Sequence, residues 1–204
     1  MNQKLKKEFK KLKNYQKLIY EDVYLWSKHY LEVPNTHLNN MPACPFAKKA
    51  WKEDKVWIEI RNPEIGYRGQ LKKLLKSLDF TKKEILIFCD PFFQEFSLNK
   101  FQKEIDSFNN KYNRKDIYFL GFHPKNPPTE EDQNFLLNPT GDTSDLPDGR
   151  IDFSMMLIQK FSQLYESSDR LKRMGYYDKW PQEYYEDVVL ARQNLYKKLL
   201  TEGG

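Results

Sequence analysis

The fold class of this 204-residue chain depends on residues 84–90, Glu-Ile-Leu-Ile-Phe-Cys-Asp. Residues 85–89 are all apolar, which is typical of a strand that is covered on both faces of its sheet. Pro91 follows directly and ends the strand, because proline has no N–H group for the ladder. The stretch therefore predicts a buried strand of an α/β domain.

Further strands and helices are predicted on both sides of this strand. Residues 56–60 (Val-Trp-Ile-Glu-Ile) and 116–122 (Asp-Ile-Tyr-Phe-Leu-Gly-Phe) have the composition of strands. Between the strands, apolar residues recur with helical spacing from Leu71 to Leu78 and from Phe96 to Phe108, and Ser97 suits a helix N-cap. The order β-α-β-α-β predicts right-handed crossovers and a small, largely parallel sheet.

Helices are expected to flank this core. Apolar residues recur with helical spacing over about residues 3–31, before Pro34, and again in the last third of the chain, where residues 151–165 carry a broad apolar face. We therefore expect three parts, which are a basic N-terminal helix (1–32), an α/β core domain (33–165) and a C-terminal helical extension that packs on the core (166–204).

Charge and cysteine content limit the setting of the protein. The net charge is +5, and six lysines crowd residues 4–13. Such a basic helix can contact nucleic acid or an anionic surface, or it can be a solvated face without arginine, the better phosphate ligand. Two cysteines without a CxxC pair, no secretion signal and no apolar run of about 20 residues predict a soluble cytoplasmic protein that does not enter a membrane.

Cys44 is the first candidate for chemistry. Pro45 suits the first position of a helix, which places Cys44 at the N-cap. Free N–H groups and the helix dipole there would favour a thiolate and lower the pKa of the thiol. The alternative is a structural role, because cysteine is among the most buried residue types. His37, which lies in the preceding loop, is a weaker candidate for the same site.

Asp90 and His123 each follow a predicted strand. In parallel sheets, ligands bind beyond the carboxyl ends of the strands. The sequence therefore predicts an enzyme in which Cys44 is the nucleophile, His123 its base and Asp90 the residue that orients the ring. Alternatively, Cys44 and His123 would ligate haem iron or a transition metal, or they would bind a small-molecule cofactor.

A non-enzymatic interaction module is the competing hypothesis. In that case the basic N-terminal helix and the aromatic C-terminal helices would bind a protein or nucleic-acid partner. The aromatic residues around Pro181 lack an interleaved Arg/Lys stripe, which disfavours nucleic acid. Residues 124–150 form a long irregular segment that is typical of a functional cover or a linker. Its Asp142, Asp145 and Asp148 are better explained by turns than by a calcium loop.

Two short motifs carry a resemblance to a known family. Cys44-Pro45-Phe46-Ala47 together with Phe122-His123-Pro124 resembles an uncharacterised bacterial family, domain of unknown function 1415. The apolar strand and aromatic-rich helix over residues 85–109 are similar to the middle portion of that family, and the resemblance covers about residues 38–165. The family implies no activity, but its motifs point to the same Cys44 and His123.

Overall fold

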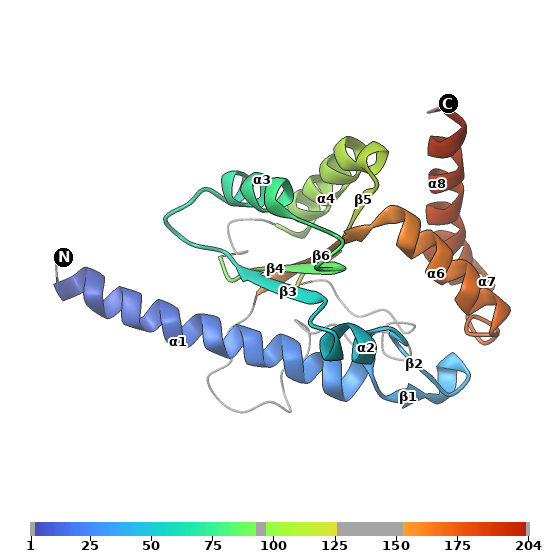
Figure 1. The fold of residues 1–204 in the computed structure, drawn as a ribbon, viewed down its shortest axis with the longest axis horizontal. Helices are drawn as coiled ribbons and strands as arrows, with labels where there is room; N and C mark the ends of the chain where they lie inside the picture. The colour runs from blue at the N-terminus through green and yellow to red at the C-terminus, as the bar shows by residue number, and fades with distance from the viewer. Residues whose placement is uncertain (1–2, 93–96, 126–152, 203–204) are drawn as a thin grey trace.

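The computed structural model describes residues 3–92, 97–125 and 153–202 (Figure 1). The first part contains α1 (Gln3–Trp26), a π-helical turn (Ser27–Leu31), β1 (Pro34–Asn35), a 3₁₀ turn (Thr36–Leu38), β2 (Met41–Pro42) and α2 (Ala47–Lys52). The core continues with β3 (Val56–Ile60), α3 (Tyr67–Ser77), β4 (Ile85–Asp90), α4 (Leu98–Tyr112), a 3₁₀ turn (Asn113–Lys115) and β5 (Ile117–Phe122). The C-terminal part contains β6 (Ser154–Lys160), α6 (Phe161–Arg173), α7 (Gln182–Tyr185), a π-helical turn (Glu186–Leu190) and α8 (Ala191–Glu202).

The central sheet has four strands in the order β3-β4-β6-β5. Strands β3 and β4 are parallel, whereas β6 is antiparallel to both β4 and β5. Strands β3, β4 and β5 therefore point in one direction, as the β-α-β-α-β pattern predicts. The sheet is mixed, because β6 lies antiparallel between β4 and β5. The α/β class, the N-terminal helix and the C-terminal helices are confirmed. Ser97 caps α4, because its side chain accepts a hydrogen bond from the Lys100 N–H at 3.3 Å.

One predicted helix is wrong. Residues 151–165 were expected to be helical, but Ser154–Lys160 form β6 in the interior of the sheet, and α6 begins only at Phe161. The reason is that β6 is covered on both faces, so that Met155, Met156 and Ile158 are all buried. A continuous apolar run of this kind is compatible with a buried strand or with a buried helix, and periodicity does not separate the two.

The sheet lies between two helical layers (Figure 1). Helices α3 and α4 cover one face and form a core cluster with Leu86, Phe88, Phe119, Met156 and Ile158. Helix α1 covers the other face and packs on Ile87, Cys89 and Met155. The alternation along β4 between these two clusters follows from the two-residue period of a strand. Cys89 is fully buried in the second cluster, as expected from its place in the strand.

The C-terminal helices pack beside β5, the edge strand. Phe161 at the start of α6 contacts Tyr118 of β5, with ring centroids 4.6 Å apart, and Tyr196 of α8, with centroids 4.9 Å apart. A separate small cluster joins Leu171 and Tyr176 to Leu38 of the N-terminal part. None of the helices in the described ranges is both long and apolar enough to cross a membrane.

Candidate functional site

Polar residues line up across the sheet edge at which β3, β4 and β5 end. Ile60 pairs with Cys89, so Arg61 follows opposite Asp90. Asp90 in turn pairs with Ser154. Phe122 pairs with Met155, which brings His123 opposite Ser154. We call Arg61, Asp90, Ser154 and His123 the polar row.

All members of the polar row point to the side of the sheet that α3 and α4 cover. Asp90 is two residues after Phe88 and Ser154 is two before Met156, and both of these apolar residues belong to that face. The exposed fractions are 8% for Arg61 and 2% for each of the other members. Neighbouring strands lie about 4.8 Å apart, so the backbones of Asp90 and His123 are roughly 10 Å apart with Ser154 between them.

Arg61 and Asp90 form a buried ion pair. Nη1 of Arg61 lies 3.2 Å from Oδ1 and 3.1 Å from Oδ2 of Asp90. The backbone N–H of Phe92 donates to Oδ1 at 2.8 Å. Burial of two charges is costly, and such a pair persists only where geometry and further hydrogen bonds compensate. Helix α3 contributes Tyr67, whose ring lies 5.9 Å from the guanidinium carbon.

Tyr67 is held in its protonated form. Its hydroxyl donates to the sulfur of Met156 at 3.4 Å. Burial, followed by the nearby charge of Asp90, raises the pKa of this phenol well above its usual range. The phenol therefore acts next to the polar row as a neutral hydrogen-bond donor.

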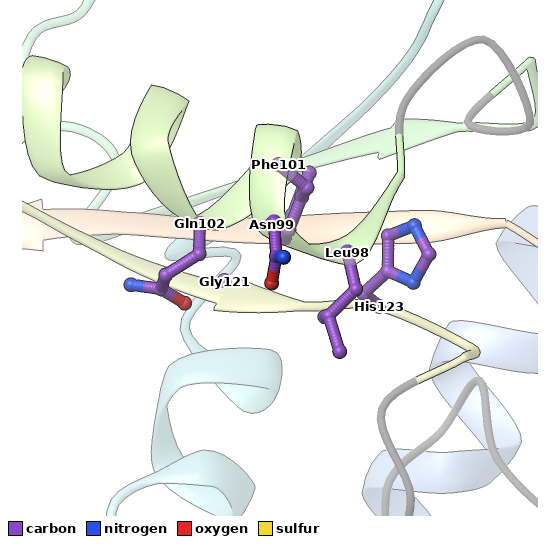
Figure 2. A pocket seen from close by; sticks show the side chains of 6 residues that line it. All are labelled: Leu98, Asn99, Phe101, Gln102, Gly121 and His123. Carbon is purple, nitrogen blue, oxygen red and sulfur yellow. The ribbon is translucent and has the colours of Figure 1, made fainter.

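His123 lies at the end of β5 beside the first turn of α4. Its Nδ1 accepts a hydrogen bond from the Lys125 N–H at 3.1 Å, and its ring centroid lies 5.3 Å from that of Phe101. Because Nδ1 accepts, the proton of the neutral ring resides on Nε2. Figure 2 shows His123 next to side chains that descend from α4 toward β5. They line a pocket of about 240 Å³, formed by Leu98, Asn99, Phe101, Gln102, Gly121 and His123.

Gly121 permits the close approach of α4 to β5. A Cβ atom at this position would lie 2.7 Å from Cγ1 of Ile105 and 2.8 Å from the ring of Phe101. Real Cβ atoms do not come this close to neighbouring side chains, so any larger residue would push α4 outward. The glycine therefore keeps the first turn of α4, with its amide side chains, beside His123.

Cys44 is surrounded by other parts of the chain. Its N–H donates to the Leu31 carbonyl at 2.9 Å, and Glu32 and Tyr176 lie near its thiol. The structure thus gives Cys44 neighbours from the end of the first helix and from the turn after α6, whereas His123 contacts α4 and Asp90 contacts Arg61. The meeting of Cys44 with His123 and Asp90 stays a prediction.

The predicted helix start at Cys44 is wrong by two residues. Helix α2 begins at Ala47 with Phe46 at its N-cap, because residues 44–47 first form a turn closed by the Ala47 N–H and the Cys44 carbonyl at 3.1 Å. The N–H groups of Phe46 and Ala47 still bond to the thiol and favour the thiolate. Burial is the larger effect, so the pKa of Cys44 is raised, not lowered as the N-cap position predicted.

The raised pKa leads to a prediction about reactivity. At neutral pH we expect iodoacetamide to alkylate Cys44 several-fold more slowly in the folded protein than in urea, because the raised pKa lowers the thiolate fraction and burial shields the thiol. The rate should rise only as the pH exceeds the usual thiol range. Peptide mapping by mass spectrometry separates Cys44 from Cys89. Alkylation faster than that of free cysteine would instead support a catalytic thiolate.

A metal site built of three or more ligands receives no support from the described residues. In the ranges that the structure covers, no three His, Cys, Asp or Glu side chains come together closely enough to hold a metal ion. A site made of Cys44, His123 and a carboxylate is therefore not formed by these residues as placed. His37 is exposed and lies in the 3₁₀ turn after β1. Asp142, Asp145 and Asp148, with most of the predicted 124–150 segment, lie outside the described residues.

The chain matches no family model, no curated protein and no solved structure. The resemblance to domain of unknown function 1415 therefore remains a prediction from two short motifs.

Sequence reasoning missed Arg61 and Ser154. Arg61 follows the predicted strand 56–60 directly, just as His123 follows the strand 116–122, so the rule that selected His123 applied equally to Arg61. Ser154 had no such signal, because the apolar pattern that follows it predicts a helix.

Proposed function

We propose that the protein is an enzyme that acts on a small polar substrate at the carboxyl edge of its sheet, with His123 as the acid–base residue. The polar row is the observation that supports this proposal. The stability of the fold does not require the ion pair in this row, because apolar residues of similar volume often replace buried ion pairs without loss of stability. Buried titratable groups gathered at the carboxyl ends of strands are typical of active sites.

The environment of His123 suits proton transfer. Its Nδ1 accepts from the Lys125 N–H, which orients the ring and puts the proton of the neutral ring on Nε2. The pocket beside it carries the amides of Asn99 and Gln102, which donate and accept hydrogen bonds. Its volume of about 240 Å³ matches a substrate smaller than most drug-like ligands.

Asp90 and Cys44 have other roles in this proposal than in the enzyme that the sequence predicts. In this proposal Asp90 holds the Arg61 guanidinium in place and does not orient the His123 ring. Thiol chemistry by Cys44, as nucleophile or as a ligand of haem or a metal, stays a prediction from the sequence. The proposed acid–base function does not depend on it.

Turnover by His123 can be tested with a mixture of candidate substrates. The protein is incubated with a cell metabolite extract, and mass spectrometry records which metabolites are consumed and formed. We expect the His123→Asn variant, which keeps an acceptor near the position of Nδ1, to slow this conversion by about a hundredfold, as loss of a general acid or base does. The matched control is His29→Asn at an exposed histidine, which should react like the wild type.

The interaction module remains the second candidate because α1 exposes large apolar side chains. The exposed fractions are 41% for Leu18, 48% for Tyr20, 40% for Tyr24 and 40% for Leu25. If this module is the function, no metabolite changes in the extract, and His123→Asn behaves as the wild type. Conversion at an unchanged rate in a folded His123→Asn variant would equally overturn the acid–base role.

A further inference from the structure

A second cluster of polar residues lies at the other end of β5, around Arg192 of α8. Figure 1 shows α6 and α8 near each other, and Nη2 of Arg192 donates to Oγ of Ser168 in α6 at 3.1 Å. Ser168 itself donates to the Leu164 carbonyl at 2.9 Å. Tyr118 is the second residue of β5 and His123 follows the last, so this cluster is separated from His123 by roughly 16 Å of strand.

Arg192 is largely buried without a carboxylate. Within the described ranges, acidic residues form ion pairs with Arg61, Arg68, Arg114 and Arg173. No acidic residue in these ranges forms an ion pair with Arg192. Its Nε is buried and has no hydrogen-bond partner in the part of the chain that the structure describes. An arginine cannot shed its charge at neutral pH, so a buried one needs compensation from elsewhere.

The groups around Arg192 are hydroxyls. The phenols of Tyr118 and Tyr177 lie close enough to Arg192 to act on its charge, and Tyr177 also bonds to Ser168. Burial is the largest effect on both phenols and raises their pKa values, so they remain protonated donors at neutral pH. The hydroxyl of Tyr185, whose ring centroid lies 5.2 Å from that of Tyr177, is buried and has no hydrogen-bond partner among the described residues. Nζ of Lys172 lies 5.5 Å from the Tyr185 ring centroid.

We propose that Arg192, with the hydroxyl of Tyr177, binds the oxyanion group of a small molecule, a phosphate or a carboxylate, while Ser168 holds the guanidinium in place. An arginine fork and neutral hydroxyl donors are the groups that recognise such anions. Arg192 and Tyr177 are both partly exposed, so the cluster borders on solvent. A π-helical turn (Glu186–Leu190) directly precedes α8, and such turns occur frequently at functional sites.

Inorganic phosphate and acetate are suitable probes. Each is titrated into the protein at constant ionic strength, with chloride as the balancing ion, and the shift in thermal midpoint reports binding. We expect one of the two anions to raise the midpoint, and which one does so names the class of the ligand. Arg192→Met should weaken its apparent affinity by about tenfold or more, which corresponds to loss of a charge-assisted hydrogen bond.

Two further variants make the test decisive. Tyr177→Phe retains the ring and removes only the hydroxyl, so it should weaken binding roughly 2- to 10-fold even if Arg192→Met does not fold. Arg114→Met is the matched control, because Arg114 is 67% exposed and paired with Glu202. Stabilisation by neither anion, or equal stabilisation of the wild type, Arg192→Met and Tyr177→Phe, would overturn the proposed site.

Discussion

Replacement of Asp90 with alanine is expected to lower the free energy of unfolding by about 3–5 kcal/mol. Asp90 is 2% exposed, and both of its carboxylate oxygens lie within 3.2 Å of Nη1 of Arg61. The variant keeps the charge of Arg61 in a buried position and removes the carboxylate that offsets it. The Phe92 N–H, which donates to Asp90 at 2.8 Å, loses its acceptor as well. Urea unfolding followed by circular dichroism measures the change.

Two variants separate burial from charge. Asp169→Ala removes an exposed acid that pairs with Arg173 at 3.1 Å, and we expect a change within about 1 kcal/mol. The double variant Arg61→Met, Asp90→Leu replaces the whole pair with apolar residues and should recover most of the loss, as other buried pairs do. An Asp90→Ala variant that is as stable as Asp169→Ala would show that the pair is hydrated in solution.

Recovery of stability in the double variant would also bear on the proposed function. An ion pair that can be replaced without loss of stability is retained for another reason, and a role in the proposed active site is such a reason. Metabolite conversion by the double variant should then be reduced although the protein is folded. Stability and turnover measured on the same variants therefore distinguish a structural from a functional ion pair.

Local pattern was sufficient for most of the fold. Strands β3, β4 and β5 and helices α3 and α4 follow from apolar periodicity, from Pro91 and from the Ser97 cap, which are properties of a few adjacent residues. Strand β6 was missed because its assignment depends on distant partners. It lies between β4 (residues 85–90) and β5 (residues 117–122). The sequence of residues 154–160 alone does not indicate these neighbours.

The candidate site was predicted only in part, because some of its features depend on residues that are distant in the sequence. Asp90 and His123 were selected because strand ends of one direction meet at one edge, and the structure places both in the polar row. The pKa of Cys44 was misjudged because the N-cap argument considers only the N–H groups that follow it. The burial that outweighs them involves the turn after α6, more than 130 residues later, where the Tyr176 hydroxyl donates to the Ala43 carbonyl at 2.7 Å.

Replacement of Ile158 with alanine is expected to lower the free energy of unfolding by about 2–5 kcal/mol. Ile158 is fully buried in β6, where it pairs with Leu86 of β4 on one side and Phe119 of β5 on the other. Truncation leaves a cavity between α3, α4 and the sheet that a packed core cannot fill. Ile65→Ala makes the same change at a residue that is 40% exposed, and we expect it to stay within about 0.5 kcal/mol of the wild type.

A double-mutant cycle tests the position of β6 directly. Because Ile158 and Phe119 are register partners, Ile158→Ala and Phe119→Leu should be non-additive by about 0.5–3 kcal/mol. Ile158→Ala and Leu18→Ala should add, since Leu18 is on α1 at the opposite face and is 41% exposed. If residues 151–165 were a helix outside the sheet, no register would join Ile158 to Phe119, and the first cycle would be additive too. Ser154 would then leave the polar row, so this cycle also tests whether Asp90 and His123 are bridged across the sheet edge.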